Sequence, residues 1–229
     1  MPSTFSAPKV SAWRMALMNA SPDRADELAK RIAKQGPLLQ NRLYRTYSEG
    51  DQVEALTEQL LAAAVDIGLK RSQELWDLDL SRQSKPDWHQ QGAVGYTAYV
   101  DHFAGNLRGV VDRIDYLKSL GVTYLHLLPF FKAAEGPNDG GFAVANFEVV
   151  EPRLGTQADL QHLTQALRTA GISLCSDFVL NHVAHDHEWA VEARKGNPEF
   201  QNFFCMAHSQ AEVDAWEKNL PQIFPDTAP

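Results

Sequence analysis

The sequence predicts an α/β fold in which a helical N-terminal part precedes a parallel sheet. Up to about residue 81, apolar residues recur at spacings of three and four, as in amphipathic helices. After Gly92, short and nearly continuous apolar runs alternate with helical segments, which is typical of a parallel sheet buried on both faces. The last of these runs ends in three polar residues, Asp177, Asn181 and His182. Such strand ends are typical of the C-terminal rim of a parallel barrel, where active sites lie.

The composition fits a globular protein and disfavours two classes of partner. Of the 229 residues, 44% are hydrophobic and 22% are charged, so a core can form. The net charge is −8 with acids and bases interspersed, so we expect neither a nucleic-acid nor a membrane partner. The chain has no apolar run of membrane-spanning length and its N-terminus has no signal-peptide core, so we expect a cytoplasmic protein. The two cysteines, Cys175 and Cys205, are expected to be small buried hydrophobes rather than a disulfide.

The N-terminal part is expected to be helical throughout. Ser21, Pro22 and Asp23 supply an N-cap, a proline at the first helical position and an acid in the first turn. Gly36 and Pro37 are expected to end this helix. Further helices are expected over residues 39–47, 53–67 and 69–80. The polar segment that follows, residues 84–91, contains a proline and is interpreted as a linker.

The remainder is expected to alternate strands and helices. A strand over residues 93–100 precedes a helix over 107–120, which Gly121 ends, and a second strand over 122–129. A long loop is expected from Phe130 to Gly155. The order strand, helix, strand then continues with a further helix and a third strand, which predicts a βαβαβ unit.

The second helix of this unit has the clearest start signal. Thr156 and Asp159 form a capping box, and Gly171 ends the helix. The third strand is expected over residues 172–176. The inner face of the barrel is expected to be lined by apolar side chains of the three strands, including Val94, Leu125, Leu127 and Leu174.

The motif Asp177-Phe-Val-Leu-Asn-His182 resembles the first conserved motif of the α-amylase superfamily, glycoside hydrolase family 13. In that family the motif ends the third strand of a TIM (β/α)8 barrel. Three more segments match in order and spacing, over residues 121–132, 135–144 and 181–189. Together they are similar to the amylosucrase and sucrose hydrolase branch in particular, which also has a helical N-terminal subdomain.

This resemblance implies a division of the chain into three parts. Residues 1–90 would form the helical subdomain with its linker. Residues 91–182 would form the first three strands of the catalytic barrel, about three βα units. Residues 183–229 would begin the domain that is inserted after strand three.

The resemblance also implies a reaction. The family uses a retaining mechanism, in which a carboxylate nucleophile forms a glucosyl-enzyme and a second carboxyl group acts as acid and then base. By resemblance both groups lie beyond Pro229, so no residue of this chain is expected to be catalytic and the chain alone is expected to be inactive. The parent protein is expected to cleave sucrose and pass glucose to water or to an α-glucan. The alternatives are an α-glucosidase or trehalose-processing relative, or a non-enzymatic truncated product with an incomplete sugar pocket.

Three residues of the motif are implied to form one wall of a glucose site. His182 would hydrogen-bond a hydroxyl of the glucosyl ring, which a neutral imidazole can do. Asp177 would orient the polar groups of the site rather than react. Asn181 is expected to act through hydrogen bonds rather than as a calcium ligand, because no acidic cluster surrounds it.

Two residues of the preceding loop are implied to close the site. Asp139 would close the floor of a one-sugar pocket through an ion pair with an arginine; alternatively it is a turn aspartate that caps its own backbone, as the following Gly140 and Gly141 suggest. Phe142 stands where the family usually has a tyrosine, and its ring can still stack on the sugar. We expect no metal and no cofactor, since the spacing of the nearby histidines fits no metal motif. The expected ligand is a small sugar, sucrose, and the oligomeric state is left open.

Overall fold

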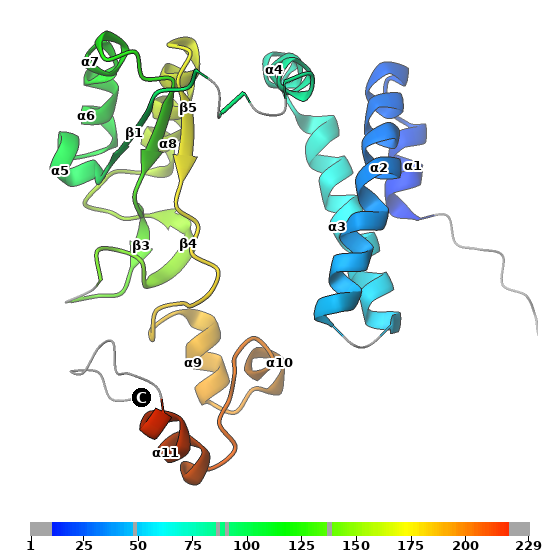
Figure 1. Cartoon of the computed structure of the whole chain (residues 1–229), viewed down its shortest axis with the longest axis vertical. Helices are drawn as coiled ribbons and strands as arrows, with labels where there is room; N and C mark the ends of the chain where they lie inside the picture. Colours follow the sequence, from blue (N-terminus) through cyan, green and yellow to red (C-terminus); the bar gives the residue numbers. More distant parts are fainter. Residues whose placement is uncertain (1–10, 48–49, 86–87, 90–91, 137–138, 220–229) are drawn as a thin grey trace, which may run out of the picture. The chain divides into compact units, whose positions relative to one another are not determined.

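The computed structural model describes residues 11–47, 50–85, 88–89, 92–136 and 139–219 (Figure 1). The chain divides into two compact units, Met1–Trp88 and His89–Pro229. The first contains only helices in its described residues, and the second combines two small sheets with helices. The structure therefore confirms the predicted fold class, a helical part followed by an α/β part.

Over its described residues the helical unit contains four helices, α1 (Ala12–Met18), α2 (Pro22–Thr46), α3 (Gly50–Lys70) and α4 (Gln73–Gln83). Helix α2 begins at Pro22 as predicted, with Ser21 as the N-cap residue. The prediction that it ends at Gly36 and Pro37 is wrong, because the helix continues through both residues.

Close packing of α2 on α3 accounts for the uninterrupted helix. A proline inside a helix removes one hydrogen bond and costs about 3 kcal/mol. The two helices nonetheless approach so closely that a Cβ atom on Gly68 of α3 would lie 2.8 Å from Leu28 of α2. Leu28 and Gly36 are both buried in this contact. The apolar surface that is buried between α2 and α3 offsets the cost of Pro37. The residues around Pro37 do not indicate this packing.

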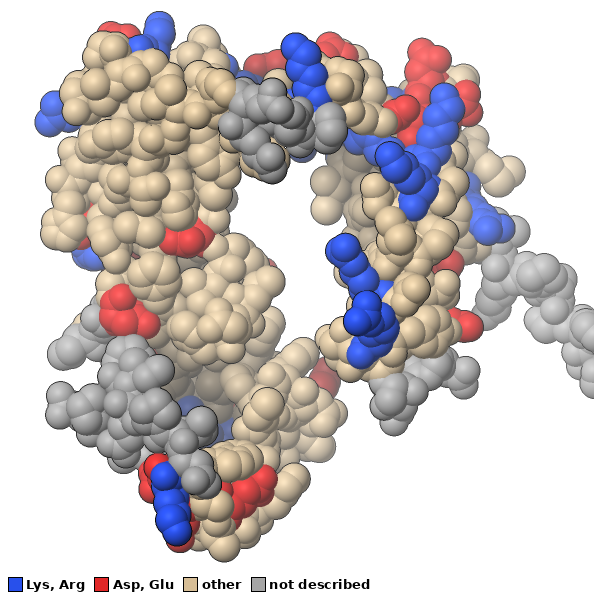
Figure 2. Space-filling model, viewed as in Figure 1, with Lys and Arg blue, Asp and Glu red and all other residues tan. Residues whose placement is uncertain are grey.

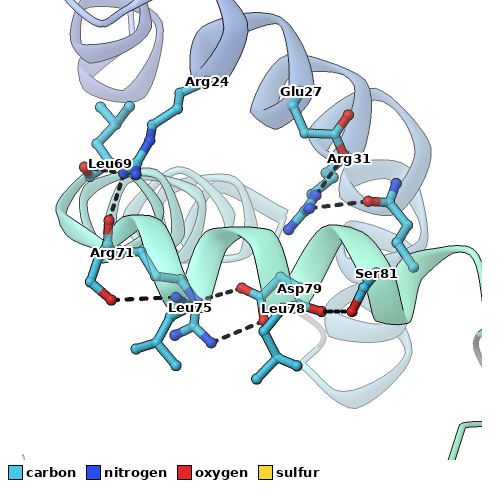
Figure 3. Close-up of polar contacts among 11 residues, drawn as sticks. Arg24, Glu27, Arg31, Leu69, Arg71, Leu75, Leu78, Asp79 and Ser81 are labelled. Atoms are coloured by element: carbon cyan, nitrogen blue, oxygen red, sulfur yellow. Dashed lines mark hydrogen bonds and ion pairs between the residues drawn. The ribbon is translucent and has the colours of Figure 1, made fainter.

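Arg24 of α2 connects the end of α3 to α4 (Figure 3). Its Nη1 donates to the backbone carbonyl of Leu69 at 3.0 Å and to that of Arg71 at 2.6 Å. These carbonyls lie at the C-terminal end of α3, where a helix leaves its last acceptors without partners. The guanidinium groups of Arg24 and Arg31 also lie 5.0 and 5.2 Å from the ring centre of the buried Trp76. Figure 2 shows basic and acidic side chains interspersed over this unit.

The α/β unit is built on a three-stranded parallel sheet with the order β1-β2-β5. The strands are β1 (Gly95–Ala98), β2 (Tyr124–Leu127) and β5 (Ser173–Ser176). Four helices connect them: α5 (Val100–Ala104), α6 (Leu107–Asp112), α7 (Ile114–Ser119) and α8 (Gln157–Thr169). The single helix expected over residues 107–120 is therefore two helices, with Arg113 between them outside helical geometry.

The apolar face of the sheet packs on these helices. Leu125 and Leu127 are fully buried, in one cluster with Val110, Leu117, Leu163 and Leu167 of the helices, and Leu174 packs against the same cluster. The expectation that Leu125, Leu127 and Leu174 line the barrel interior is thus wrong. Because side chains alternate along a strand, the opposite face carries Thr97, His126 and Cys175 instead, while Val94 is exposed.

The start of α8 confirms the predicted capping box. The Thr156 hydroxyl accepts the backbone N–H of Asp159 at 3.2 Å, and the Asp159 carboxylate accepts the backbone N–H of Thr156 at 2.9 Å. Arg108 of α6 forms an ion pair with the same carboxylate. Hydrogen bonds from Thr156, followed by that from Arg108, lower the pKa of Asp159 to about 2.

The loop expected from Phe130 to Gly155 contains an antiparallel hairpin. Its strands are β3 (Phe131–Ala133) and β4 (Val144–Val150), with irregular register. After β5 follow α9 (Glu188–Arg194), α10 (Pro198–Gln201) and α11 (Gln210–Asn219). Neither cysteine forms a disulfide; Cys175 is half-buried and Cys205 is exposed, contrary to the expectation that both are buried. None of the helices in the described ranges combines the length and the apolar character that crossing a membrane requires.

Candidate functional site

Polar side chains gather at the C-terminal edge of the three-stranded sheet. Thr97 lies on β1, His126 pairs with it in register on β2, and Asp177 comes directly after β5. The backbone N–H of Asp177 donates to the carbonyl of Leu127 at 3.3 Å, which extends the pairing of β5 with β2 by one residue. Parallel pairing therefore places all three side chains at one edge.

The Asp177 carboxylate contacts His126. Its Oδ1 lies 3.2 Å from Nε2 of the imidazole, and the Thr97 hydroxyl lies 3.5 Å from Nδ1 of the same ring. Oδ2 of Asp177 is buried and has no hydrogen-bond partner among the described residues. His126 was not among the residues predicted from the sequence, although a lone histidine between apolar residues of a strand is a signal for such a site.

Asn181 and His182 form a hydrogen-bonded pair on the segment after β5. The amide nitrogen of Asn181 lies 2.8 Å from Nδ1 of His182, and both residues are exposed. An amide nitrogen carries hydrogens and no acceptor, so with this amide orientation Nδ1 accepts and the ring proton resides on Nε2. Nε2 of an exposed ring is then a hydrogen-bond donor, which suits a sugar hydroxyl.

The loop that carries Asp139 and Phe142 packs on the ends of β1 and β2. Gly140 has a φ of +84°, and a Cβ atom there would lie 2.9 Å from the hydroxyl of Tyr99, the residue after β1. A Cβ atom on Gly141 would lie 3.3 Å from Pro129, which follows β2. The loop is therefore held at the same edge of the sheet as Asp177.

Within this loop the Asp139 carboxylate makes a turn contact. Its Oδ1 accepts the backbone N–H of Ala143 at 2.8 Å. This is the contact of a turn aspartate, the alternative to an ion pair that the sequence left open. Phe142 is half-buried, and Asp139 is exposed.

A row of aromatic rings continues from the sheet edge toward α9. The ring of Phe178 lies 5.8 Å from Phe131 of β3 and 5.0 Å from Phe147 of β4, and Phe147 lies 5.7 Å from His187. Phe178 is 54% exposed. Phe147 and Phe178 were not predicted as site residues, because they contact each other across separate segments of the chain.

His187 is a buried member of this row, which continues to Trp189 at 4.8 Å, and it is the N-cap of α9. Its Nδ1 accepts the backbone N–H of Trp189 at 3.1 Å. Burial lowers the pKa of His187, more than the nearby Glu188 and Asp186 raise it. The ring is therefore neutral at pH 7 and acts in packing. Over the described ranges, no three His, Cys, Asp or Glu side chains are grouped closely enough to hold a metal ion.

Comparison with known proteins identifies the family. Residues 46–228, more than half of the chain, match the family model described as "Alpha amylase, catalytic domain". The trehalose-6-phosphate hydrolase of Escherichia coli K12 is 32% identical over 135 residues, which are 56% of this chain and 24% of that protein. The oligo-1,6-glucosidase IMA5 of Saccharomyces cerevisiae is 34% identical over 128 residues, 52% of this chain and 22% of that protein. The chain thus spans about a quarter of the length of these curated relatives.

Solved structures also match part of the chain. The trehalose-6-phosphate hydrolase of Bacillus licheniformis is 28% identical with a TM-score of 0.46, over 50% of this chain and 22% of that one. The MutB E254Q variant in complex with sucrose is 28% identical with a TM-score of 0.46, over 52% and 22% of the two chains. The family match covers most of the α/β unit and confirms the resemblance at the level of the superfamily. The chain belongs to the α-amylase catalytic-domain family, glycoside hydrolase family 13, and its α/β unit matches the N-terminal part of the (β/α)8 barrel.

Proposed function

We propose that this chain forms one wall of the glucosyl-binding site of a retaining enzyme that acts on α-glucosides. The observation that carries the proposal is the hydrogen-bonded pair Asn181 and His182, on the segment that follows Asp177 and the C-terminal end of β5. Active sites of (β/α)8 barrels lie at this edge. Family membership supports the sugar as the ligand.

Each residue of the site has a proposed role. His182 donates from Nε2 to a hydroxyl of the glucosyl ring, and Asn181 holds His182 in the tautomer that can do so. Asp177 orients the polar groups at the strand ends. Phe142 offers a ring face to the sugar. Asp139 closes the far side of the pocket through an ion pair with an arginine, using the carboxylate oxygen that does not accept from Ala143.

We further propose sucrose as the substrate, with glucose passed to water or to an α-glucan. The similarity of residues 121–132, 135–144 and 181–189 to the amylosucrase and sucrose hydrolase branch supports this choice. A second candidate is an α-glucosidase or trehalose-processing activity. The names of the relatives, trehalose-6-phosphate hydrolase and oligo-1,6-glucosidase, favour that candidate.

The proposal assigns no catalytic carboxylate to this chain. A retaining glycosidase needs two carboxyl groups about 5–5.5 Å apart, one on each side of the scissile bond. At the described sheet edge, Asp177 is occupied by His126 on one oxygen and buried on the other. We therefore propose that Asp177 orients the polar groups of the site. We propose that the nucleophile and the acid/base are residues that are not part of these 229 residues.

Sugar titrations followed by NMR test the proposal. Sucrose, trehalose and isomaltose are each added to the ¹⁵N-labelled chain, with mannitol as a polyol control. We expect a saturable change in the His182 ring signals with sucrose, weaker changes with the other disaccharides and none with mannitol. His182→Ala should abolish the saturable shifts of backbone amide signals that accompany the ring response, whereas His185→Ala, which removes another exposed imidazole three residues away, should leave both intact. A lack of saturable response to all three disaccharides would contradict the proposed function, and a stronger response to trehalose or isomaltose would favour the second candidate.

A further inference from the structure

His126 occupies an unusual position for a polar side chain. It lies on the central strand β2 between Leu125 and Leu127, which are fully buried against the helices. Because side chains alternate along a strand, His126 lies on the opposite face of the sheet. Its side chain is 28% exposed, and that of Asp177 is 25% exposed. The pair is thus neither in the core nor fully in water.

The two nitrogens of His126 contact side chains from both neighbouring strands. Thr97 of β1 lies at Nδ1, and Asp177 after β5 lies at Nε2. The contact with Asp177, at 3.2 Å, is the closer one; the contact with Thr97, at 3.5 Å, is at the limit of a hydrogen bond. The ring therefore connects three strands that are far apart in the sequence.

The chemistry of the partners assigns the ring proton. An ionised carboxylate can only accept hydrogen bonds, so Nε2 of His126 must donate to Asp177. In the neutral ring Nδ1 is then an acceptor, and the Thr97 hydroxyl can donate to it. For the neutral ring, the contact with Asp177 accordingly selects the Nε2–H tautomer of His126.

Asp177 depends on this contact for its orientation. Oδ1 contacts His126, and Oδ2 has no partner within the part of the chain that the structure describes. The backbone of Asp177 is fixed by its N–H bond to Leu127, but that bond does not fix the side-chain torsion. Without the imidazole, the carboxylate has no described hydrogen bond that selects one rotamer.

We infer that His126 is a positioning residue that fixes the Asp177 carboxylate at the end of β5. His126 acts from the neighbouring strand and does not itself touch the sugar. The consequence for sugar binding rests on the proposed function, in which Asp177 orients the polar groups of the glucosyl site. The geometric part of the inference does not depend on that function and can be measured without a sugar.

The first measurement is made without ligand. In the ¹⁵N-labelled chain at pH 8, ring correlations of His126, assigned by their loss in His126→Gln, should show the Nε2–H tautomer. In a chain labelled with ¹³C at aspartate Cγ, the Asp177 signal, assigned by its loss in Asp177→Asn, should shift in His126→Phe. The shift should largely return in His126→Gln, whose amide N–H can reach the place of Nε2. A ring protonated on Nδ1, or an Asp177 signal unchanged in His126→Phe, would overturn the inference.

The second measurement uses D-glucose as the probe. His126→Phe should weaken glucose binding at least tenfold, and His126→Gln should stay within threefold of the wild-type chain. The double variant His126→Phe/Asp177→Asn should bind no more weakly than Asp177→Asn alone, since residues that act through one another are not additive. His162→Phe, on the exposed side of α8, is the matched control and should leave binding unchanged.

The ligand-free measurement and the glucose titration together distinguish failure of the inference about His126 from failure of the proposed function. If the wild-type chain does not respond to glucose or to disaccharides, the proposed function fails, and the inference about His126 is decided by the tautomer and by the Asp177 carboxyl signal. If the wild-type chain binds glucose and His126→Phe binds it equally well, the inference fails while the proposed function stands. Additive losses in the double variant would also overturn the inference, because His126 would then act independently of Asp177.

Discussion

Replacing Asn181 by aspartate should reverse the hydrogen-bonding capacity of His182. In the wild-type chain the Asn181 amide donates to Nδ1, which leaves Nε2 protonated. An aspartate at this position has only acceptor oxygens, so it selects a proton on Nδ1. At pH 8.5, where an ordinary imidazole is neutral, Nε2 then becomes an acceptor. The substitution preserves the size of the side chain and changes the direction of one hydrogen bond.

The size of the effect follows from that one bond. A neutral hydrogen bond contributes about 0.5–1.5 kcal/mol net, which corresponds to a roughly 2- to 13-fold change in affinity. Glucose binding to Asn181→Asp should therefore weaken by up to about tenfold, provided that the sugar hydroxyl accepts from Nε2 in the wild-type chain. Because a hydroxyl can also donate, part of the loss can be recovered, and a complete loss of binding is not expected.

The assay combines ring NMR with a glucose titration. The His182 nitrogen shifts report which nitrogen is protonated in each variant, and the titration reports affinity. Asn202→Asp introduces the same charge on another exposed asparagine and should change neither readout. A wild-type ring protonated on Nδ1, or an unchanged tautomer in Asn181→Asp, would refute the assignment of the pair.

Four further outcomes are expected. Leu127→Ala should destabilise the α/β unit by about 3 kcal/mol, measured by amide exchange in β2 and β5, because this fully buried side chain packs on the helices; an effect below 1 kcal/mol would place Leu127 elsewhere. Thr156→Ala should cost about 1 kcal/mol through loss of the α8 cap, whereas Thr164→Ala on the same helix should cost less. Because burial lowers the pKa of His187 in the folded chain, the unfolded chain takes up a proton at His187 at a higher pH, and the free energy of unfolding should fall as the pH drops below about 6.5. His187→Asn keeps an N-cap acceptor and should lose this part of the pH dependence in denaturant titrations. The 229-residue chain should release no glucose from sucrose, and turnover that disappears in His182→Ala would show that the site is catalytically complete.

Features that depend on adjacent residues were predictable from the sequence. The capping box of α8 joins Thr156 to Asp159 within one turn, and the start of α2 at Pro22 is equally local. The parallel unit was predictable because nearly continuous apolar runs mark strands that are covered on both faces. The family resemblance located the loop of Asp139 and the motif at Asp177, and the structure places both at one edge of the sheet.

Features that depend on distant contacts were not predictable. Helix α2 passes through Pro37 because α3 packs against it, and no residue near Pro37 signals that contact. Leu125 and Leu127 lie in a run that is apolar at almost every position. Because apolar and polar residues do not alternate clearly there, the sequence does not indicate which side chains face the helices. The contact between His126 and Asp177 joins β2 to the end of β5, which the hairpin and helix α8 separate in the sequence.

The strand order β1-β2-β5 has a consequence for synthesis of the chain. Gly95 pairs with Tyr124, and Tyr124 pairs in turn with Ser173, so the middle strand of the sheet receives its second neighbour long after its first. While the ribosome adds the hairpin and α8, one edge of β2 has unpaired backbone groups next to the apolar side chains of Leu125 and Leu127. Helices α1 to α4, which belong to a compact unit of their own, emerge earlier and can fold as a unit before this stage. During the interval between the synthesis of β2 and that of β5, the nascent chain therefore presents an unpaired, partly apolar strand edge that favours misassociation.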